Sequence, residues 1–130
     1  MGIVGHGVDL VEITRISDML SEHGDRFRTR CFTPEELSYA GPGSRVEAER
    51  LAARFAAKEA ILKAFGTGLR GEMEWTQMEI TRTELGRPGV KLHGPAQTLA
   101  RELGIHHWAI SLTHARTHAM ASVIAWSPES

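Results

Sequence analysis

The stretch from Val46 to Phe65 limits what this chain can fold into more than any other. It contains neither glycine nor proline, and most of its residues are Ala, Glu, Leu, Lys or Arg, which are strong helix formers. Gly66 and Gly68 follow directly, and glycine commonly ends a helix because it adopts the left-handed backbone conformation. We therefore expect one long helix over residues 46–65, against which the rest of the chain packs.

The sides of this helix differ in bulk when successive residues are placed about 100° apart. Leu51, Phe55 and Leu62 fall on one bulky stripe. A broad second side is covered by alanines, at positions 52, 53, 56, 57, 60 and 64. Because bulky side chains pack into a core and small ones let another backbone approach, this helix should be buried on most of its sides.

The charged side chains of the helix form two groups. Glu59 and Lys63 lie one turn apart at the border of the bulky stripe, where the simplest interpretation is an exposed ion pair worth roughly 0.3–0.5 kcal/mol. Arg50, Arg54 and Lys58 follow one another along a separate stripe. Since like charges at this spacing repel, the second group favours the presence of an anionic ligand.

The rest of the chain predicts short elements. Strands are expected over residues 3–14, 72–84, 90–92, 108–114 and 119–126, with a hairpin turn over 85–89. Helices are expected to begin at Thr14, to run from Pro34 to Gly41, and to cover 95–103. The expected fold class is α+β, with one long central helix packed on a mostly antiparallel sheet in a single domain over 1–130.

Charge and composition exclude several functional classes. The net charge is -1, with 15 Lys and Arg against 16 Asp and Glu, so the basic excess typical of nucleic-acid binding is missing. Cys31 is the only cysteine, which excludes an intramolecular disulfide and favours a reducing, cytoplasmic location. Neither a secretory signal nor an apolar stretch long enough to cross a bilayer is present, so no membrane association is expected.

Asp9 lies among the apolar residues of the first expected strand. Its ordinary role would be a hydrogen bond to nearby backbone, but a carboxylate in such surroundings needs a partner, a metal ion or solvent. The preceding Gly5-His6-Gly7 resembles the start of a dinucleotide-binding pattern. The third glycine of that pattern would fall on Leu10, and no helix is expected directly after it, so we reject this interpretation.

Other catalytic and metal sites are weakly supported. The chain has 7 histidines, but neighbours such as His106 and His107 would point to opposite faces of a strand, which makes a zinc cluster improbable. Ser111 and His114 lie on one expected strand, and no Gly-x-Ser-x-Gly turn accompanies them. A serine hydrolase is therefore disfavoured.

Several segments that are weak signals one by one become specific in combination. They are Gly7–Ile16, Phe32–Glu36, Arg54–Gly68, Gly86–Leu92 and Ser111–His114. In this order and spacing, over nearly the whole chain, they resemble the short bacterial type of 4′-phosphopantetheinyl transferase. Directly beside these segments, His6 and Ala115 depart from the residues more usual in that family.

The resemblance implies transfer of the phosphopantetheine arm of coenzyme A to a serine of an acyl carrier protein, releasing adenosine 3′,5′-bisphosphate, with Mg²⁺ required. By the same resemblance, Asp9 and Glu59 hold the metal ion, in agreement with the preference of Mg²⁺ for one or two protein carboxylates. Glu59 either takes the proton of the serine or orients a metal-bound water that does. Lys63 faces the leaving phosphate, so these residues form the implied catalytic group.

For coenzyme A, the resemblance implies that Arg54 and Lys58 contact further phosphates, and that Gly66 and His114 belong to the coenzyme site together with Lys63. Members of this type commonly form homotrimers with each active site at a subunit interface, and a neighbouring subunit can contribute the histidine. Trimer formation would also explain the small exposed surface of the long helix.

The carrier protein presents an acidic helix in this family of reactions, so Arg15, Arg26 and Arg28 are the expected docking residues, with Arg30 beside them. The alternative for the cluster at 26–30 is a solvated basic loop. For the whole chain, the rival function is a non-catalytic trimeric module that binds nucleotides or an acidic partner through the basic stripe of the long helix.

Overall fold

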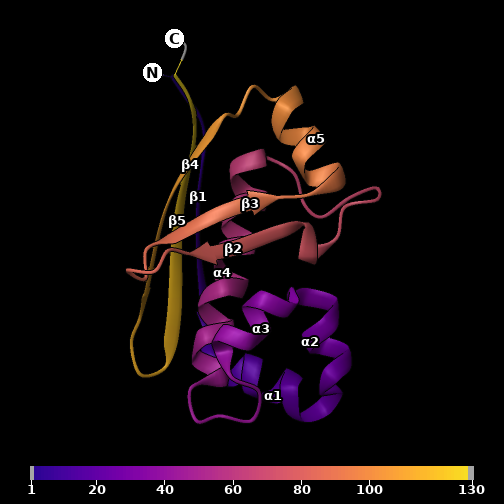
Figure 1. Ribbon diagram of the computed structural model, residues 1–130, viewed down its shortest axis with the longest axis vertical. Coiled ribbons are helices and arrows are strands. Elements are labelled where there is room, and N and C mark those ends of the chain that lie inside the picture. Colours follow the sequence, from indigo (N-terminus) through magenta and orange to yellow (C-terminus); the bar gives the residue numbers. More distant parts are fainter. Residues whose placement is uncertain (1, 129–130) are drawn as a thin grey trace.

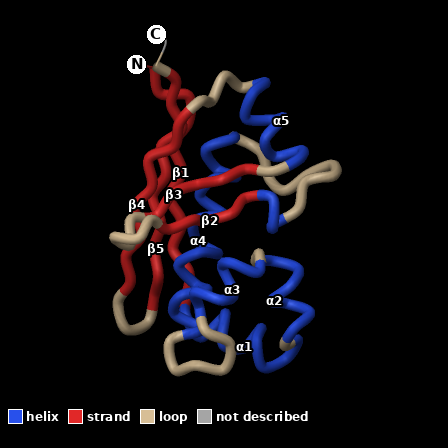
Figure 2. Tube along the Cα trace, in the orientation of Figure 1, coloured by secondary structure: helices blue, strands red, loops and turns tan. Residues whose placement is uncertain are grey.

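The structure is a computed structural model, and it describes residues 2–128. Its elements are β1 (Gly2–Glu12), α1 (Ile13–His23), α2 (Asp25–Cys31), α3 (Pro34–Ala40), α4 (Glu47–Phe65), a 3-10 turn (Trp75–Gln77), β2 (Met78–Arg82), β3 (Pro88–Leu92), α5 (Gly94–Glu102), β4 (His107–His114) and β5 (His118–Ser127). The three-stranded sheet and α4 lie side by side, with α1–α3 grouped around one end of the helix (Figures 1 and 2).

The central helix and the antiparallel sheet confirm the expected α+β fold. The larger sheet has the order β1-β5-β4, and both of its strand pairs are antiparallel. One face of the sheet covers the alanine side of α4, and Val11, Ala119, Ala121 and Val123 are buried between them. The small side chains on both elements bring the helix close to the sheet, as the sequence pattern indicates.

Two glycines in β1 make the contact with α4 still closer. A Cβ atom added to Gly7 would lie 1.9 Å from the carbonyl oxygen of Ala60, and one added to Gly5 would lie 2.1 Å from that of Ala64. No side chain fits at either position. Strand periodicity places Asp9 on the same face of β1 as these two glycines, so the aspartate also faces α4.

A second sheet was not expected as a separate unit. The single strand predicted over 72–84 is observed as the 3-10 turn followed by the shorter β2, which pairs only with β3. Met78 and Ile80 point into the core from this hairpin. α5 follows β3, close to the predicted boundaries, and buries Ala96 and Ala100.

The helices at the N-terminal end differ in detail from the prediction. α1 begins at Ile13 and has no side-chain cap, so the predicted role of Thr14 as its first capping residue is wrong. α2 occupies the stretch that could have been a basic loop, and it buries Phe27 and Cys31. The cap of α3 is as expected, because Thr33 and Glu36 form a reciprocal capping box.

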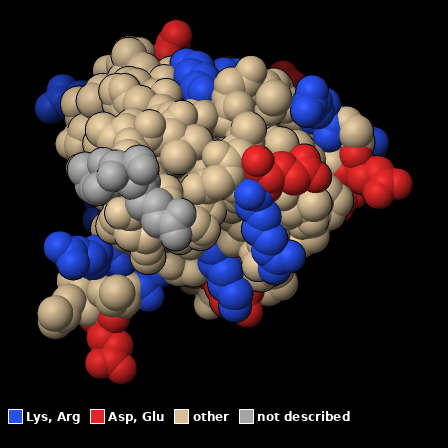
Figure 3. Space-filling view, turned by 90° about the horizontal axis from the view of Figure 1, so that it is seen from above, with Lys and Arg blue, Asp and Glu red and all other residues tan. Residues whose placement is uncertain are grey.

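The face of the larger sheet that points away from α4 remains apolar and exposed. Its largest exposed side chains include Leu10, Val8 and Met120, with exposed fractions of 60%, 41% and 38%. From the direction of Figure 3, basic and acidic side chains lie near one another without a broad patch of one sign. None of the helices within residues 2–128 is long and apolar enough to cross a membrane.

Candidate active site

Asp9, Glu59 and Lys63 come together where β1 crosses α4. Lys63 Nζ lies 3.0 Å from Asp9 Oδ1 and donates to the carbonyl oxygen of Val8 at 2.9 Å. These bonds join residues 54 and 55 positions apart in the sequence. Because Gly5 and Gly7 bring β1 against the helix backbone, the carboxylate of Asp9 reaches the side chains on α4.

The Glu59 carboxylate is half-buried beside this pair. Burial raises its pKa above the ordinary value, and the nearby Asp9 carboxylate raises it further. Arg15 and Lys63 act in the opposite direction. Two acids that influence each other in this way are close in space, and their repulsion favours either a bound cation or a proton on one of them.

The donor set fits a magnesium ion. Within residues 2–128, no three His, Cys, Asp or Glu side chains converge as a closed metal cage. Two neighbouring carboxylates with an open side match Mg²⁺, which usually keeps several waters and takes further oxygens from a substrate phosphate. Asp9 retains 18% side-chain exposure and Lys63 54%, so a phosphate can approach from solvent.

A second polar cluster lies on the other side of α4. It contains Arg54 and His114, together with Tyr39 and Arg82, around a cavity of about 260 Å³. His114 Nε2 lies 3.4 Å from a carboxylate oxygen of Glu49. The pattern of cations at four-residue spacing in α4 indicated part of this cluster, whereas Tyr39 and Glu49 carried no signal that could have singled them out.

The two clusters of one chain do not form one site. β1 and β4 are the two edge strands of the sheet, which places them about 10 Å apart. Asp9 belongs to β1 and His114 to β4. On α4, Arg54 and Glu59 project in directions that differ by about 140°. The residues expected to surround one coenzyme are therefore divided between opposite sides of the helix.

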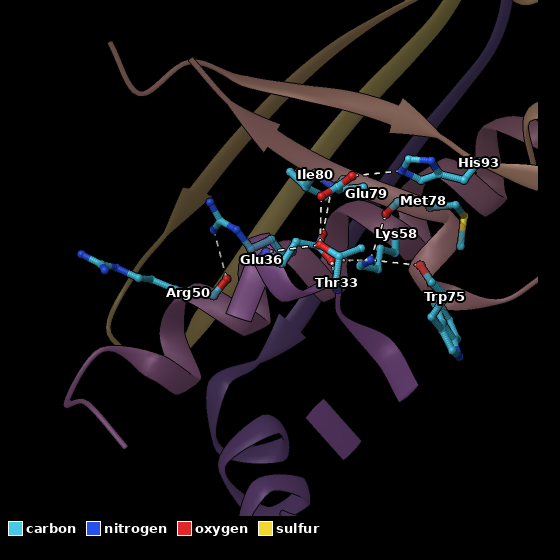
Figure 4. A network of polar contacts seen from close by, with 10 residues as sticks. Thr33, Glu36, Arg50, Lys58, Trp75, Met78, Glu79, Ile80 and His93 are labelled. Carbon is cyan, nitrogen blue, oxygen red and sulfur yellow. Dashed lines mark hydrogen bonds and ion pairs between the residues drawn. The ribbon is translucent and has the colours of Figure 1, made fainter. Parts of the chain in front are cut away.

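Lys58 is not available to a phosphate, and its predicted contact with coenzyme A is wrong for this structure. Its side chain is fully buried, and Nζ donates to Glu36 at 2.9 Å and to the carbonyl oxygens of Trp75 and Met78 at 3.0 Å and 2.9 Å. Burial lowers the pKa of Lys58, and Glu36 opposes that effect. Figure 4 shows this network, in which all three ammonium protons have acceptors.

The network continues outward from the buried ion pair. Glu36 also accepts from the backbone N–H groups of Thr33 and Ile80, and Thr33 donates through its hydroxyl to Glu79. Glu79 in turn contacts His93 at 3.0 Å. Although burial acts to raise the pKa of Glu79, its bonds with His93 and Thr33 outweigh burial and lower it. These contacts fix α4 against α3 and β2.

Arg28 is also occupied, contrary to its expected role in docking a carrier. Its guanidinium donates to both carboxylate oxygens of Glu47, at 2.7 Å and 3.1 Å, and to Asp25 at 3.0 Å. The hydrogen bond with Glu47 raises the pKa of Arg28, and the same bond lowers the pKa of Glu47. Arg28 therefore connects α2 to the start of α4.

Arg15 and Arg26 remain exposed on the side of the molecule where α1 and α2 meet α4. The Arg15 guanidinium lies 5.6 Å from the centre of the Phe55 ring. Arg26 borders a cavity of about 300 Å³ whose apolar lining includes Phe27, Phe55 and Trp75. The sequence indicated the basic side chains of this surface but not Trp75.

Gly66 ends α4 in the left-handed conformation, with φ of 81°, and its N–H donates to the carbonyl oxygens of Leu62 and Lys63. This arrangement explains why glycine follows the helix. The predicted contact of Gly66 with the coenzyme stays a prediction.

Comparison with known proteins agrees with this architecture. The family model described as "4'-phosphopantetheinyl transferase superfamily" matches residues 5–123. A holo-[acyl-carrier-protein] synthase of Koribacter versatilis (strain Ellin345) is 44% identical over 122 residues, which are 94% of this chain and 97% of that protein. The crystal structure of the Neisseria meningitidis holo-[acyl-carrier-protein] synthase has a TM-score of 0.86 and 36% identity, covering 97% of this chain and 100% of its own.

A holo-(acyl-carrier-protein) synthase from Bacillus anthracis, whose crystal structure is a complex with CoA (3′,5′-ADP), is similarly related. It is 35% identical with a TM-score of 0.77, covering 96% of this chain and 97% of that one. The matching segments, the fold and the full-length similarity lead to one assignment. The chain belongs to the 4′-phosphopantetheinyl transferase superfamily.

Proposed function

We propose that this protein is an enzyme that transfers 4′-phosphopantetheine from coenzyme A to a serine hydroxyl of an apo acyl carrier protein, in support of fatty acid or polyketide synthesis. The observation that carries the proposal is the meeting of Asp9 on β1 with Glu59 and Lys63 on α4. Relatives named holo-[acyl-carrier-protein] synthase, which match nearly the full chain, support the same reaction.

Asp9 and Glu59 are the residues that hold Mg²⁺ in this proposal. An ion held by these two carboxylates would supply neutralisation of the negative charge on the phosphates of coenzyme A. The raised pKa of Glu59 and its repulsion by Asp9 support a site that gains from a cation.

The protein itself has mainly to position the reactants and to move one proton. Glu59 accepts the proton of the carrier serine, directly or through an ordered water. Lys63 is exposed and its ammonium lies beside Asp9, so it can turn toward the leaving phosphate. The bond that breaks joins this phosphate to the phosphorus that the serine oxygen attacks.

A homotrimer completes the site in this proposal. Arg54 and His114 lie on the side of α4 opposite Asp9 and Glu59, so a neighbouring subunit brings its own copy of the second cluster to the metal-binding pair. The exposed apolar face of the sheet, which includes Val8, Leu10 and Met120, is the surface that subunits bury.

The carrier protein docks on the surface formed by Arg15, Arg26 and the neighbouring Arg30. The apolar cavity beside Arg26 accepts a hydrophobic side chain of the carrier, and the arginines attract its acidic helix. Arg28 is left out of this contact because Glu47 occupies it. Cys31 is a free, buried thiol, which supports a reducing, cytoplasmic setting.

The decisive experiment is incubation of the protein with coenzyme A, Mg²⁺ and an apo carrier protein, followed by mass spectrometry of the carrier. Addition of the phosphopantetheine mass only when all three are present supports the transferase. Coenzyme binding with an unchanged carrier mass would favour the non-catalytic module instead.

A further inference from the structure

Three guanidinium groups gather around one tyrosine ring in the second cluster. The guanidinium carbons of Arg82, Arg54 and Arg50 lie 4.2 Å, 4.3 Å and 4.7 Å from the centre of the Tyr39 ring. Tyr39 belongs to α3, two of the arginines to α4 and the third to β2. One aromatic side chain of α3 thus contacts cations from two other elements.

These cations lack partners of opposite charge. Within residues 2–128, none of the three arginines is ion-paired with a carboxylate. Two of the nearby acids have other contacts, since Glu36 is bonded to Lys58 and Glu49 lies beside His114. Contacts with the ring face offset part of the mutual repulsion of the guanidinium groups, but they leave the positive charge in place.

Arg54 shows most clearly that the cluster lacks a ligand. It is 2% exposed, and its Nε and Nη2 have no hydrogen-bond partner within residues 2–128, while Nη1 donates to the carbonyl oxygen of Arg50. Burial lowers the pKa of Arg54 from its ordinary value, and the neighbouring Arg82 and Arg50 add to that effect. Buried donors without acceptors are costly, so an oxygen-rich anion would stabilise this arrangement.

Two cavities beside the tyrosine are lined by Tyr39, Arg54 and Arg82. The first, of about 260 Å³, also reaches Glu49 and His114. The second, of about 560 Å³, reaches Lys91 but is also lined by Glu35, Glu36 and Glu79, so the first suits an anion better. Because Arg82 is exposed, the cluster is open to solvent at one edge. A ligand can therefore enter without rearrangement of the core.

From this geometry we propose that Tyr39 is the positioning residue that makes the protein specific for the 3′-phosphate of coenzyme A, because its ring aligns Arg54 and Arg82 toward that group. The inference rests on the proposed function and deepens it. The 3′-phosphate is the only phosphomonoester of the coenzyme, and its oxygens match a fork of several guanidinium donors better than the diphosphate linkage does.

The role of Tyr39 follows from the two faces of its ring. Without the ring, the guanidinium groups lose the surface that holds them close together, and repulsion drives exposed Arg82 into solvent. Phenylalanine keeps the aromatic face, whereas leucine keeps only the bulk. The hydroxyl group of the tyrosine is not needed for the effect.

The test measures the dissociation constants of coenzyme A and of dephospho-coenzyme A, which lacks the 3′-phosphate, by calorimetry in phosphate-free buffer. Tyr39→Leu should weaken coenzyme A binding about tenfold, in line with the loss of cation–π contacts. It should change dephospho-coenzyme A binding less than about twofold, and Tyr39→Phe should bind both compounds much as the unchanged protein does.

Arg82→Gln is the second variant, because Arg82 is exposed and its replacement leaves the core intact. It should reduce the preference for coenzyme A over dephospho-coenzyme A, measured as the ratio of their dissociation constants, by about fivefold. Arg101→Gln on α5 is the control for loss of one exposed charge. Equal weakening of both ligands by Tyr39→Leu, or an unchanged preference in both variants, would overturn the inference. Because these experiments measure binding, failure of the Tyr39 inference would leave the transferase proposal standing. Conversely, a carrier of unchanged mass would refute the transferase proposal without deciding the role of Tyr39 in binding.

Discussion

At the scale of single residues, the proposed chemistry depends on the two acids that meet across β1 and α4, Asp9 and Glu59. Glu59→Gln removes one carboxylate with almost no change in volume, and Asp9→Asn does the same on the strand. If these carboxylates hold Mg²⁺, each variant should lower kcat/KM at least about 10³-fold, equivalent to about 4 kcal/mol of transition-state stabilisation. Carrier modification followed by mass spectrometry over time measures the effect.

Circular dichroism and thermal unfolding of the same variants serve as controls. Removing either carboxylate relieves the repulsion between Asp9 and Glu59, so the fold should be retained. Asp9→Asn also weakens the ion pair with Lys63, but that lysine is exposed, so the change in stability should be small. Full transfer activity in either variant would contradict the site assignment.

Lys58 illustrates how a buried ion pair can be mistaken for a ligand site. Lys58→Met leaves Glu36 buried without its cation, and breaking such a pair costs about 3–5 kcal/mol in the free energy of unfolding. Urea denaturation should show this loss, while Lys91→Met at an exposed position of β3 should change stability little. Unchanged stability together with a raised KM for coenzyme A would restore the original phosphate-binding interpretation.

At the scale of elements, the packing of β1 on α4 depends on two missing side chains. Gly7→Ala places a Cβ atom 1.9 Å from the carbonyl oxygen of Ala60, and backbone cannot yield as a flexible side chain can. The expected loss of stability is about 3 kcal/mol or more. Because displacement of β1 also moves Asp9 away from Glu59, Mg²⁺-dependent transfer should fall with it.

Gly68→Ala is the matched control for Gly7→Ala, since a Cβ atom added at Gly68 meets nothing within 4 Å. Thermal unfolding of the two variants gives the comparison. Equal stability of both would show that β1 does not approach the helix as closely as this structure has it.

The connection between α2 and α4 should make stability depend on pH. The hydrogen bond from Arg28 lowers the pKa of Glu47 below its unfolded value of about 4.5, so the stabilisation is complete above that pH and is lost as the pH falls through the lower, folded value. Glu47→Gln should therefore be about 2 kcal/mol less stable near pH 7, and the difference should shrink below about pH 4.

Chemical denaturation across this pH range measures the difference. Glu84→Gln in the exposed hairpin turn is the control, for which no such pH-dependent gap is expected. A gap between Glu47→Gln and the unchanged protein that stays constant down to pH 3 would assign the effect to packing and not to ionisation.

The sequence predicted those elements best whose formation depends on neighbouring residues in the chain. α4 lies within one residue of its predicted start because helix propensity and the terminal glycine are local. α2 was missed because its stability comes from burying Phe27 and Cys31 against distant parts of the chain. The same limit applies to the site, since the contact of Asp9 with Lys63 is a tertiary contact, and only the family resemblance suggested it.

At the scale of the whole molecule, the separation of the two polar clusters is the main consequence of the fold. α4 displays Glu59 toward β1 and Arg54 toward the opposite side, near β4. Helical periodicity already implied different directions for these residues, but not that their neighbourhoods would be separated by the width of the sheet. One subunit thus offers each half of the proposed site to a different neighbour.

This arrangement predicts complementation between inactive variants. Glu59→Gln should disable the proposed metal-binding half, and the double variant Arg54→Met with His114→Ala should disable the proposed coenzyme-binding half. Each alone should be inactive. When the two are denatured and refolded together in equal amounts, random assembly gives roughly a quarter of the interfaces two intact halves, and about a quarter of the original activity should return.

The same mixture also decides between a shared site and a site within one chain. If both halves came from the same subunit, every subunit in the mixture would carry a defect and no activity could return. Light scattering tests whether the refolded species are trimers. Mixing the two variants after separate refolding provides the control, in which recovery should wait for subunit exchange. Activity that returns only in the co-refolded trimers would mean that the substrate-binding groups are supplied across the apolar face of the sheet.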